Sequence, residues 1–247
     1  MHSSTRLWLA AACALAALAA VPATAGAKVT AELRVEATNG KILADTEQKT
    51  SPASVKTDRG ADCFGAPGGS GDRVDIPNNT ALGLLADALP DNRALRPLSI
   101  TDQFSFGLGI CGVGGEVASG AGFWYLKRNH VGAQVGGDAL KVKDGDRILW
   151  YLAPSFPVGD ELALRAPRRA KPGVPVDVRV VSYTDKGKRK PAKGAAVGLG
   201  ANPTNADGET TVTFRKAGSR SLQAKRKGDI PSNAVRVCVK TDPSKCK

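Results

Sequence analysis

The stretch from Gly122 to Leu152 constrains the fold more than any other, because it alternates in the manner of strands and is broken by turns. It carries two aromatic runs, Phe123-Trp124-Tyr125 and Trp150-Tyr151. Between the runs lie a loop at Asn129-His130 and a tight turn at Asp144-Gly145-Asp146. The stretch therefore predicts a β unit rich in hairpins, with aromatic rings along its strands.

Upstream, the pattern predicts two further strands and a loop. Residues 29–37 alternate as a first strand, with Leu33 and Val35 on one face. An Asn-Gly turn leads into a short strand over residues 42–44. Residues 45–75 are polar and rich in glycine, proline and serine, so we expect a long loop there. Its glycine run lacks the Gly-Lys-Ser/Thr ending of a phosphate-binding loop.

One segment has the pattern of a helix. Residues 79–89 place three leucines and an alanine at i, i+3, i+4 and i+7, a single stripe that we expect to face a core. Asn79 or Thr80 can cap its start, and Pro90 ends it. Further strands are expected over residues 98–110, 125–127, 140–142 and 147–152. The first half is therefore predicted to be an α+β unit, with the helix packed on a mixed sheet.

The second half predicts an antiparallel β-sandwich, because short alternating segments recur at the spacing of such folds. These segments cover residues 162–165, 174–183, 195–199, 210–215, 219–224 and 233–237. We place one domain at residues 28–154, a linker at 155–160, a second domain at 161–240 and a tail at 241–247. The predicted fold class is mainly β with two domains.

Motifs in both halves resemble known families. A capped T-A-L-x-x-L helix, then G-F-W-Y-L-x-x-N and G-x-x-x-L-x-V-x-D-G-D-x-I-L-W-Y, resembles the transcobalamin C-terminal-like domain, a β-grasp-like module of bacterial secreted proteins. This chain departs from it in the long cysteine-containing loop and in His130, where glycine commonly follows Asn129. Related domains of animal transcobalamins help to hold cobalamin, but the matched residues are mostly structural.

The second half carries T-N-A-D-G-E-x-T-V-T-F and A-G-x-x-x-L-x-A, which resemble the signatures of a bacterial Ig-like domain. That resemblance implies an Ig-like antiparallel β-sandwich acting as a spacer or adhesion module.

The N-terminus has the pattern of a secretory signal. Arg6 precedes an apolar, Ala/Leu-rich run over residues 7–21, and two A-x-A patterns follow. We expect residues 1–27 to be a signal peptide, no transmembrane segment to remain after its removal, and the protein to be secreted or at the cell surface. A membrane anchor and lipidation at Cys13 are the weaker alternatives, because the apolar run is shorter than a spanning helix and ends in Pro22.

Four cysteines would remain in the mature chain: Cys63, Cys111, Cys238 and Cys246. An even count in an exported chain implies disulfides, with three possible connectivities. The economical pairing joins Cys63 to Cys111 and Cys238 to Cys246, and the second pair would pin the tail. Zinc is the competing interpretation. The spacings do not fit zinc motifs and only one imidazole, that of His130, would remain, so no metal is predicted.

The positive charge is concentrated in the last third of the chain. The net charge is +12, yet residues 1–159 carry 15 Lys+Arg against 15 Asp+Glu, while residues 160–247 carry 20 against 8. Two basic groups stand in expected loops and would form one patch if those loops meet: Lys186, Lys188, Arg189 and Lys190, with Lys225, Arg226 and Lys227. The excess favours anionic partners such as cell-wall glycans, or is ordinary solvated charge. Nothing predicts sequence-specific nucleic-acid binding.

Candidate binding residues come from the aromatic stretch. Adjacent residues of a strand point to opposite faces, so at least one of Trp124 and its neighbours is expected to reach the surface. The candidates are Trp124, Tyr125, Asn129, His130 and Trp150. Asp144 and Asp146 have the pattern of turn formers. Neither this turn nor the one at residues 205–209 offers the ligand count of a calcium loop.

These patterns lead to three functional hypotheses. The first is a non-enzymatic, exported binding or adhesion protein whose basic Ig-like domain favours anionic cell-wall polymers. The alternative is an extracellular carrier for a small planar ligand such as a corrinoid. An enzyme ranks third, because no serine lies in a G-x-S-x-G motif and a single imidazole remains. No cofactor is predicted, and a cobalamin-type ligand enters only with the alternative.

Overall fold

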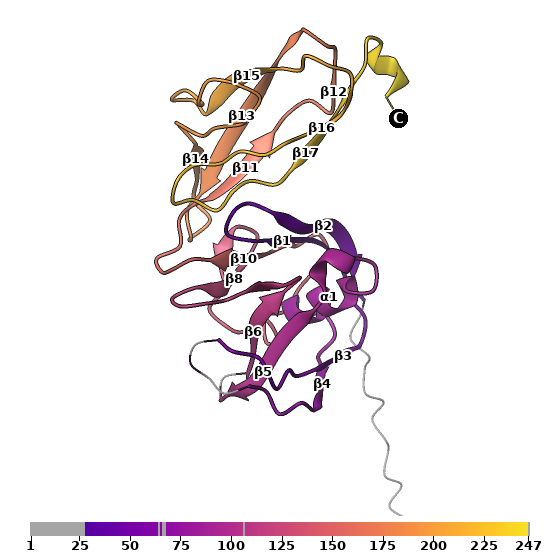
Figure 1. Cartoon of the computed structure of the whole chain (residues 1–247), viewed down its shortest axis with the longest axis vertical. Coiled ribbons are helices and arrows are strands. Elements are labelled where there is room, and N and C mark those ends of the chain that lie inside the picture. The colour runs from indigo at the N-terminus through magenta and orange to yellow at the C-terminus, as the bar shows by residue number, and fades with distance from the viewer. Residues whose placement is uncertain (1–27, 64, 66–67, 106, 247) are drawn as a thin grey trace, which may run out of the picture.

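The chain forms two β-rich domains stacked along the long axis of the molecule, and so confirms the predicted mainly β, two-domain fold class (Figure 1). The structure is a computed structural model that describes residues 28–63, 65, 68–105 and 107–246. The expected signal peptide and Cys13 lie outside the described residues. Within the described part, one α-helix accompanies seventeen strands and two short 3₁₀ helices, at Arg93–Leu95 and Pro243–Lys245.

A five-stranded sheet organises the first domain. Its order is β2 (Ile42–Lys49), β1 (Thr30–Glu36), β10 (Arg147–Ala153), β8 (Phe123–Arg128) and β9 (Val131–Gly132). Strands β1 and β10 pair in parallel, so that Val35 lies opposite Trp150, while β2 and β8 flank them in antiparallel fashion. As predicted, Leu33 and Val35 share the face that looks into the core of the first domain.

The predicted helix is present as α1 (Ala81–Ala88). Thr80 caps it, because its Oγ1 accepts a hydrogen bond from the Gly83 amide at 3.2 Å. The expectation of a single apolar stripe is wrong, since every residue of α1 except Asp87 is buried. The helix lies against the sheet on one side and the segment after β9 on another, where the Leu82 amide donates to Gly137. Asp87 itself accepts hydrogen bonds from Ser51.

Three predicted segments of the first domain differ from the structure. The expected loop at 45–75 contains the end of β2 and the hairpin of β3 (Ala53–Lys56) with β4 (Arg73–Ile76). The expected strand at 98–110 is a second hairpin, β5 (Leu98–Phe104) with β6 (Gly107–Val113), beside β7 (Glu116–Val117). Residues 140–142 form a single bridge, between Lys141 and Thr80, in place of a strand, and the Leu140 carbonyl accepts from the first amide of α1.

The second domain is a sandwich of two sheets. One holds β11 (Glu161–Arg165), β13 (Pro175–Tyr183), β14 (Arg189–Pro191) and β15 (Glu209–Thr213). The other holds β12 (Arg169–Ala170), β17 (Val235–Val239) and β16 (Gly218–Leu222). Val178 and Val180 point into the core between them, as the alternation predicts. The expected strand at 195–199 is reduced to one bridge between Ala196 and Lys225. The sequence pattern did not predict the short strands β12 and β14.

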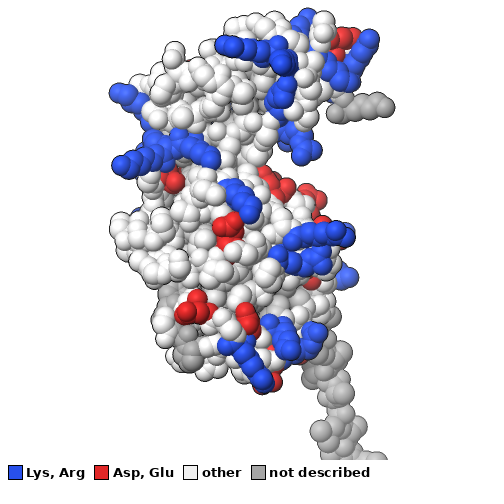
Figure 2. All heavy atoms as spheres, in the orientation of Figure 1, with Lys and Arg blue, Asp and Glu red and all other residues white. Residues whose placement is uncertain are grey.

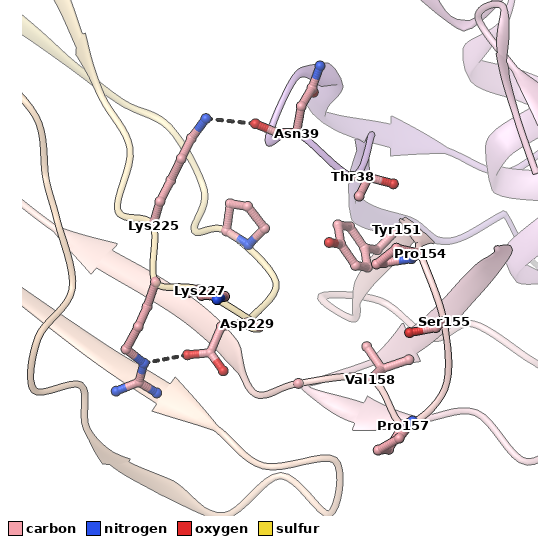
Figure 3. A pocket seen from close by; sticks show the side chains of 14 residues that line it. Thr38, Asn39, Tyr151, Pro154, Ser155, Pro157, Val158, Lys225, Lys227 and Asp229 are labelled. Carbon is pink, nitrogen blue, oxygen red and sulfur yellow. Dashed lines mark hydrogen bonds and ion pairs between the residues drawn. The ribbon is translucent and has the colours of Figure 1, made fainter. Parts of the chain in front are cut away.

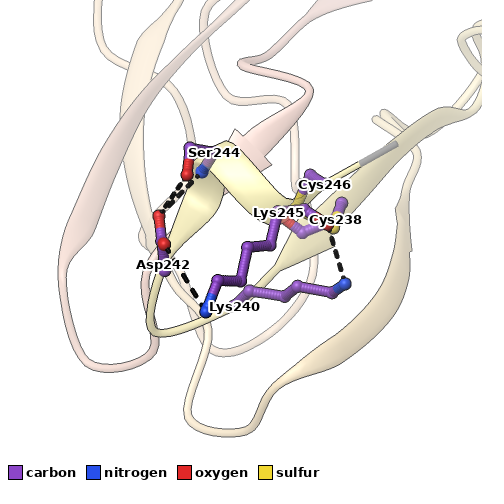
Figure 4. Close-up of a disulfide and its surroundings, with 6 residues drawn as sticks. All are labelled: Cys238, Lys240, Asp242, Ser244, Lys245 and Cys246. Atoms are coloured by element: carbon purple, nitrogen blue, oxygen red, sulfur yellow. Dashed lines mark hydrogen bonds and ion pairs between the residues drawn. A yellow bond between two sulfur atoms is a disulfide. The ribbon is translucent and has the colours of Figure 1, made fainter.

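Two disulfides join the four described cysteines in the economical pairing. Cys63–Cys111 spans 48 residues and ties the polar loop to β6 in the core. Cys238–Cys246 spans 8 residues and holds the tail against the end of β17, as Figure 4 shows. The turn between the second pair is ordered by Asp242, which accepts hydrogen bonds from the amide and hydroxyl of Ser244.

Candidate functional site

Strand alternation divides the aromatic residues between the two faces of the five-stranded sheet. Trp124 and Trp150 point to the side of α1 and belong to the core of the first domain. Phe123, Tyr125 and Tyr151 point to the other face and pack with residues of the second domain. None of the five rings is fully exposed, but Phe123 and Tyr125 are half-buried and so reach the surface in part, as expected. The second domain covers the face that would otherwise be solvated.

The first domain has an apolar groove beside its two tryptophans. The groove encloses about 460 Å³ and is lined by residues of β5, β6, β8, β10 and the segment at 133–137. Its main side chains are Phe104, Leu108, Ile110, Trp124, Val135 and Trp150. Gly137 allows the backbone to lie against the Trp150 ring, because a Cβ there would come within 2.5 Å of the indole. The groove is thus a ring-lined surface with a tight backbone wall.

Both tryptophans that line the groove have a buried indole N–H group that lacks an acceptor. Trp124 and Trp150 are only 7 % and 4 % exposed, and neither Nε1 has a hydrogen-bond partner among the described residues. Burying a donor without an acceptor costs about 1–3 kcal/mol.

Asn129 and His130 form the tip of the hairpin between β8 and β9. Both have positive φ angles, 51° and 70°, as the two central residues of a type I′ turn require. The Asn129 amide group donates to Asp146 at 2.7 Å and accepts from the Arg147 amide at 2.9 Å. Asn129 therefore joins two turns through one donor and one acceptor of its amide group.

The Asp144-Gly145-Asp146 turn is confirmed as a structural element. Asp146 accepts a hydrogen bond from the Lys143 amide at 2.8 Å, and Asp144 accepts one from the Thr30 amide at 2.7 Å. Gly145 has a φ of 76°, which favours glycine. Both carboxylates thus serve the backbone at the start of β1 and β10.

His130 contacts the second domain instead of the tryptophans. Its ring stacks on Tyr183, with centroids 3.7 Å apart and planes inclined by 4°. Its Nδ1 lies 3.0 Å from Oε2 of Glu161. The structure thus separates the five candidate residues: Trp124 and Trp150 line the groove together, Asn129 holds turns, and His130 belongs to the interface. Tyr125 borders the groove, but its hydroxyl donates to Asp185 of the second domain.

A buried cluster of charges lies between the domains, and sequence reasoning missed it. Arg34 on the outward face of β1 donates through Nη2 to Glu161 Oε1 at 2.9 Å, and its Nε lies 3.7 Å from Glu36 Oε2. The Lys127 ammonium is 3.8 Å from Glu161 and 3.8 Å from Asp185. Charged residues that alternate with apolar ones along a strand ordinarily face solvent. Only the position of the second domain makes that face an interface.

The buried charges have altered pKa values. Burial raises the pKa of Glu36 to about 8, against the opposing effect of Arg34. Burial lowers the pKa of Lys127, although Glu161 and Asp185 counteract it. For Glu161, burial acts to raise the pKa, but His130, Arg34 and Lys127 together outweigh it and hold the pKa below its usual value. Glu161 is therefore the ionised centre of the cluster.

A crevice of about 460 Å³ lies where the linker and the residue 225–229 loop meet the first domain (Figure 3). Lys225 reaches across and donates to the Asn39 carbonyl at 2.7 Å, with its side chain lying over Gly40. Arg226 turns back to Asp229 at 2.6 Å. Tyr151 forms part of the opposite wall. Lys225 thus links the two domains, while Arg226 stabilises its own loop.

One residue from each predicted basic group lies beside Asp160. Lys190 Nζ lies 2.7 Å and Arg226 Nη2 lies 4.0 Å from the same oxygen of Asp160. Four further side chains of the groups have no polar partner among the residues described: Lys186, Lys188, Arg189 and Lys227. Figure 2 shows blue side chains over the upper domain and at the waist of the molecule. Lys190 and Arg226 therefore lie close together, both beside Asp160.

The described residues contain no cluster of three or more side chains suited to hold a metal ion. No helix in this part of the chain is long and apolar enough to cross a membrane.

Comparison with known proteins yields little. Neither protein-family models nor curated protein sequences match the chain. Among solved structures, it is similar to haptocorrin in complex with Cbi, at 12 % identity and a TM-score of 0.35 over 53 % of this chain. The match spans 26 % of the haptocorrin chain. A likeness of this size does not assign the chain to a family.

Proposed function

We propose that this protein is an exported, non-enzymatic binding protein whose first domain takes a small ligand in the groove of Trp124 and Trp150. The ligand would have a flat apolar face and a hydrogen-bond acceptor at its edge. The observation that carries the proposal is an apolar, ring-lined groove formed by two tryptophans whose buried indole N–H groups lack acceptors. The two disulfides are consistent with an extracellular protein.

A binding role is also supported by where reactive side chains lie. The cysteines are oxidised in pairs, and the described imidazole is engaged by Tyr183 and Glu161. A nucleophile of the usual kind needs a base that can reach it. The residues that line the groove supply aromatic rings and two indole donors, and they include no nucleophile with a base beside it. Binding is the chemistry these residues favour.

Intrinsic fluorescence provides a selective test. The chain has three tryptophans, and the third, Trp8, belongs to the predicted signal peptide, so emission of the mature protein reports on the groove alone. We expect a saturable change with an aromatic probe that carries an acceptor group, 8-anilinonaphthalene-1-sulfonate, and calorimetry should then compare cobinamide with hydroxocobalamin. Trp150→Phe keeps a ring but removes one donor, and should weaken binding about fivefold.

A second variant blocks the groove from its exposed rim, so its effect on binding does not depend on a substitution in the core. Val135 lines the groove and is 53 % exposed, so Val135→Arg should close the groove without disturbing the fold. Val117, similarly exposed at 53 % and outside the groove lining, provides the matched control as Val117→Arg. If Val135→Arg and the parent chain bound the probes equally, or if no probe bound, the groove would not be a ligand site.

A second candidate function rests on the basic patch at Asp160. The proximity of one residue from each group supports attachment to an anionic polymer such as a cell-wall glycan. Retention on purified anionic wall polymer should fall steeply with salt, and Lys188→Glu/Arg189→Glu should abolish it. Lys171→Glu/Lys216→Glu makes the same charge change near the opposite end of β13 and should have a smaller effect. Equal effects of the two double variants would show that only net charge matters.

A further inference from the structure

A second cleft between the domains lies on the opposite face of the sheet from the tryptophan groove. It encloses about 370 Å³ between the outward face of β1, β2 and β10 and the edge strand β11. The residues that matter are Arg34, Arg147, Glu161, Arg165, Arg168 and His130. Clefts at domain interfaces are common ligand sites, because two rigid walls meet there.

Three of the arginines in this cleft retain donors without acceptors. Arg165 and Arg168 are exposed, and their guanidinium groups have no partner among the residues described. Arg34 is mostly buried, with its Nη2 fixed by Glu161 at 2.9 Å, while its Nε has no hydrogen bond. The nearest carboxylate to that Nε is 3.7 Å away on Glu36, which is beyond hydrogen-bond distance.

The acidic residues of the cleft are poor competitors for these arginines. Glu161 is already shared by Arg34, Lys127 and His130. Glu32 pairs with Arg147 at 2.7 Å. Burial raises the pKa of Asp45, so its side chain is more readily protonated and attracts an arginine less strongly. The cleft therefore offers a surplus of guanidinium donors, which bind planar and tetrahedral oxyanions well.

We propose that this cleft binds a small molecule bearing an oxyanion, phosphate or carboxylate, held by Arg165 and Arg168 with the Nε of Arg34 at its base. The bound group would touch both domains, β1 from the first and β11 from the second. This site lies apart from the tryptophan groove, so either can be occupied, or fail to be, without the other.

Calorimetric titration of the purified protein at constant ionic strength tests the site. Inorganic phosphate and citrate are the probes, and comparing them separates a phosphate site from a carboxylate site. We expect saturable binding of at least one probe. Arg165→Ala/Arg168→Ala should weaken that binding about tenfold or more, because each charge-assisted contact is worth at least about 1.5 kcal/mol. Both side chains are exposed, so the variant keeps its fold.

Arg215→Ala/Lys216→Ala is the matched control, since it removes the same charge from exposed residues that do not line the cleft. Its affinity for the bound probe should stay within about twofold of the parent chain. The site is excluded if neither probe gives saturable heat. It is also excluded if the control weakens binding as much as the cleft variant, because the attraction would then be diffuse.

Discussion

Arg34 of the first domain donates a hydrogen bond to Glu161 of the second at 2.9 Å, and both side chains are nearly buried. Glu161 begins β11, directly after the linker, so this one contact fixes the second domain against β1. Glu36, two residues beyond Arg34, also reaches across and accepts from Gln223 at 3.2 Å. The outward face of β1 therefore holds the domains together by polar contacts that water does not reach.

Removing Arg34 should destabilise the protein strongly. Arg34→Ala leaves Glu161 buried with less compensation, and breaking such a pair costs about 3–5 kcal/mol. Arg179→Ala is the control, because Arg179 and Glu209 are 3.8 Å apart and about half exposed, where a pair contributes about 0–1 kcal/mol. Urea unfolding measures both. Similar losses in the two variants would mean that the interface bond contributes little.

Glu36 should make the stability depend on pH. Its pKa is 4.5 when unfolded and about 8 when folded. Between these values the folded chain holds a proton that the unfolded chain releases, so its contribution to the free energy of unfolding is complete below pH 4.5 and falls until about pH 8. Each unit of difference corresponds to about 1.4 kcal/mol, so the total change is several kcal/mol.

Thermal unfolding of Glu36→Gln measures this contribution. Glutamine keeps an oxygen that can accept from Gln223, but it cannot ionise. The variant should gain stability over the parent chain as the pH is raised from 5 to 9, and the two should approach each other near pH 4.5. A constant difference across this range would show that Glu36 does not titrate in the interface.

The two disulfides should differ in what they contribute. Loop-closure entropy gives about 4 kcal/mol for the 48-residue separation of Cys63 and Cys111, and about 2.5 kcal/mol for the 8-residue separation of Cys238 and Cys246. Unfolding of the two double alanine variants provides the comparison. A larger loss for the second pair would point to a contribution from the tail contacts instead of the loop.

The linker should tolerate no side chain at residue 159. A Cβ on Gly159 would lie 1.9 Å from the Gly228 carbonyl oxygen, so the linker and the 225–229 loop would have to separate. We expect Gly159→Ala to cost about 1–3 kcal/mol. Gly60→Ala, whose nearest neighbour would be at 3.4 Å, should change stability by about 0.5 kcal/mol or less. Differential scanning calorimetry separates these outcomes.

Sequence patterns correctly predicted the elements that depend only on neighbouring residues in the chain. The α1 cap at Thr80, the turns at Asn129 and Asp144, and the inward face of Leu33 and Val35 all follow from neighbours in the sequence. The short strands β3 and β4 were missed because they bury few residues and their hairpin is joined by a long polar segment.

The site residues show where sequence reasoning stops. Trp124 and Trp150 were identified, but their joint groove depends on which face of the sheet α1 covers. Arg34 and Glu161 carry no sequence signal, because an alternating charged residue predicts a solvated face. Only the docking of the second domain, far along the chain, places Glu161 beside Arg34.

The parallel pairing of β1 with β10 also determines the order in which the chain can assemble. Val35 pairs with Trp150, which lies more than a hundred residues later in the chain. The central pair of the sheet can therefore form only after nearly the whole first domain has been synthesised. Until then β1 and β2 are a lone hairpin with an unpaired edge, which is marginally stable in water. Because Glu161 follows β10 by only a few residues, completion of the sheet and arrival of the second domain's first strand nearly coincide.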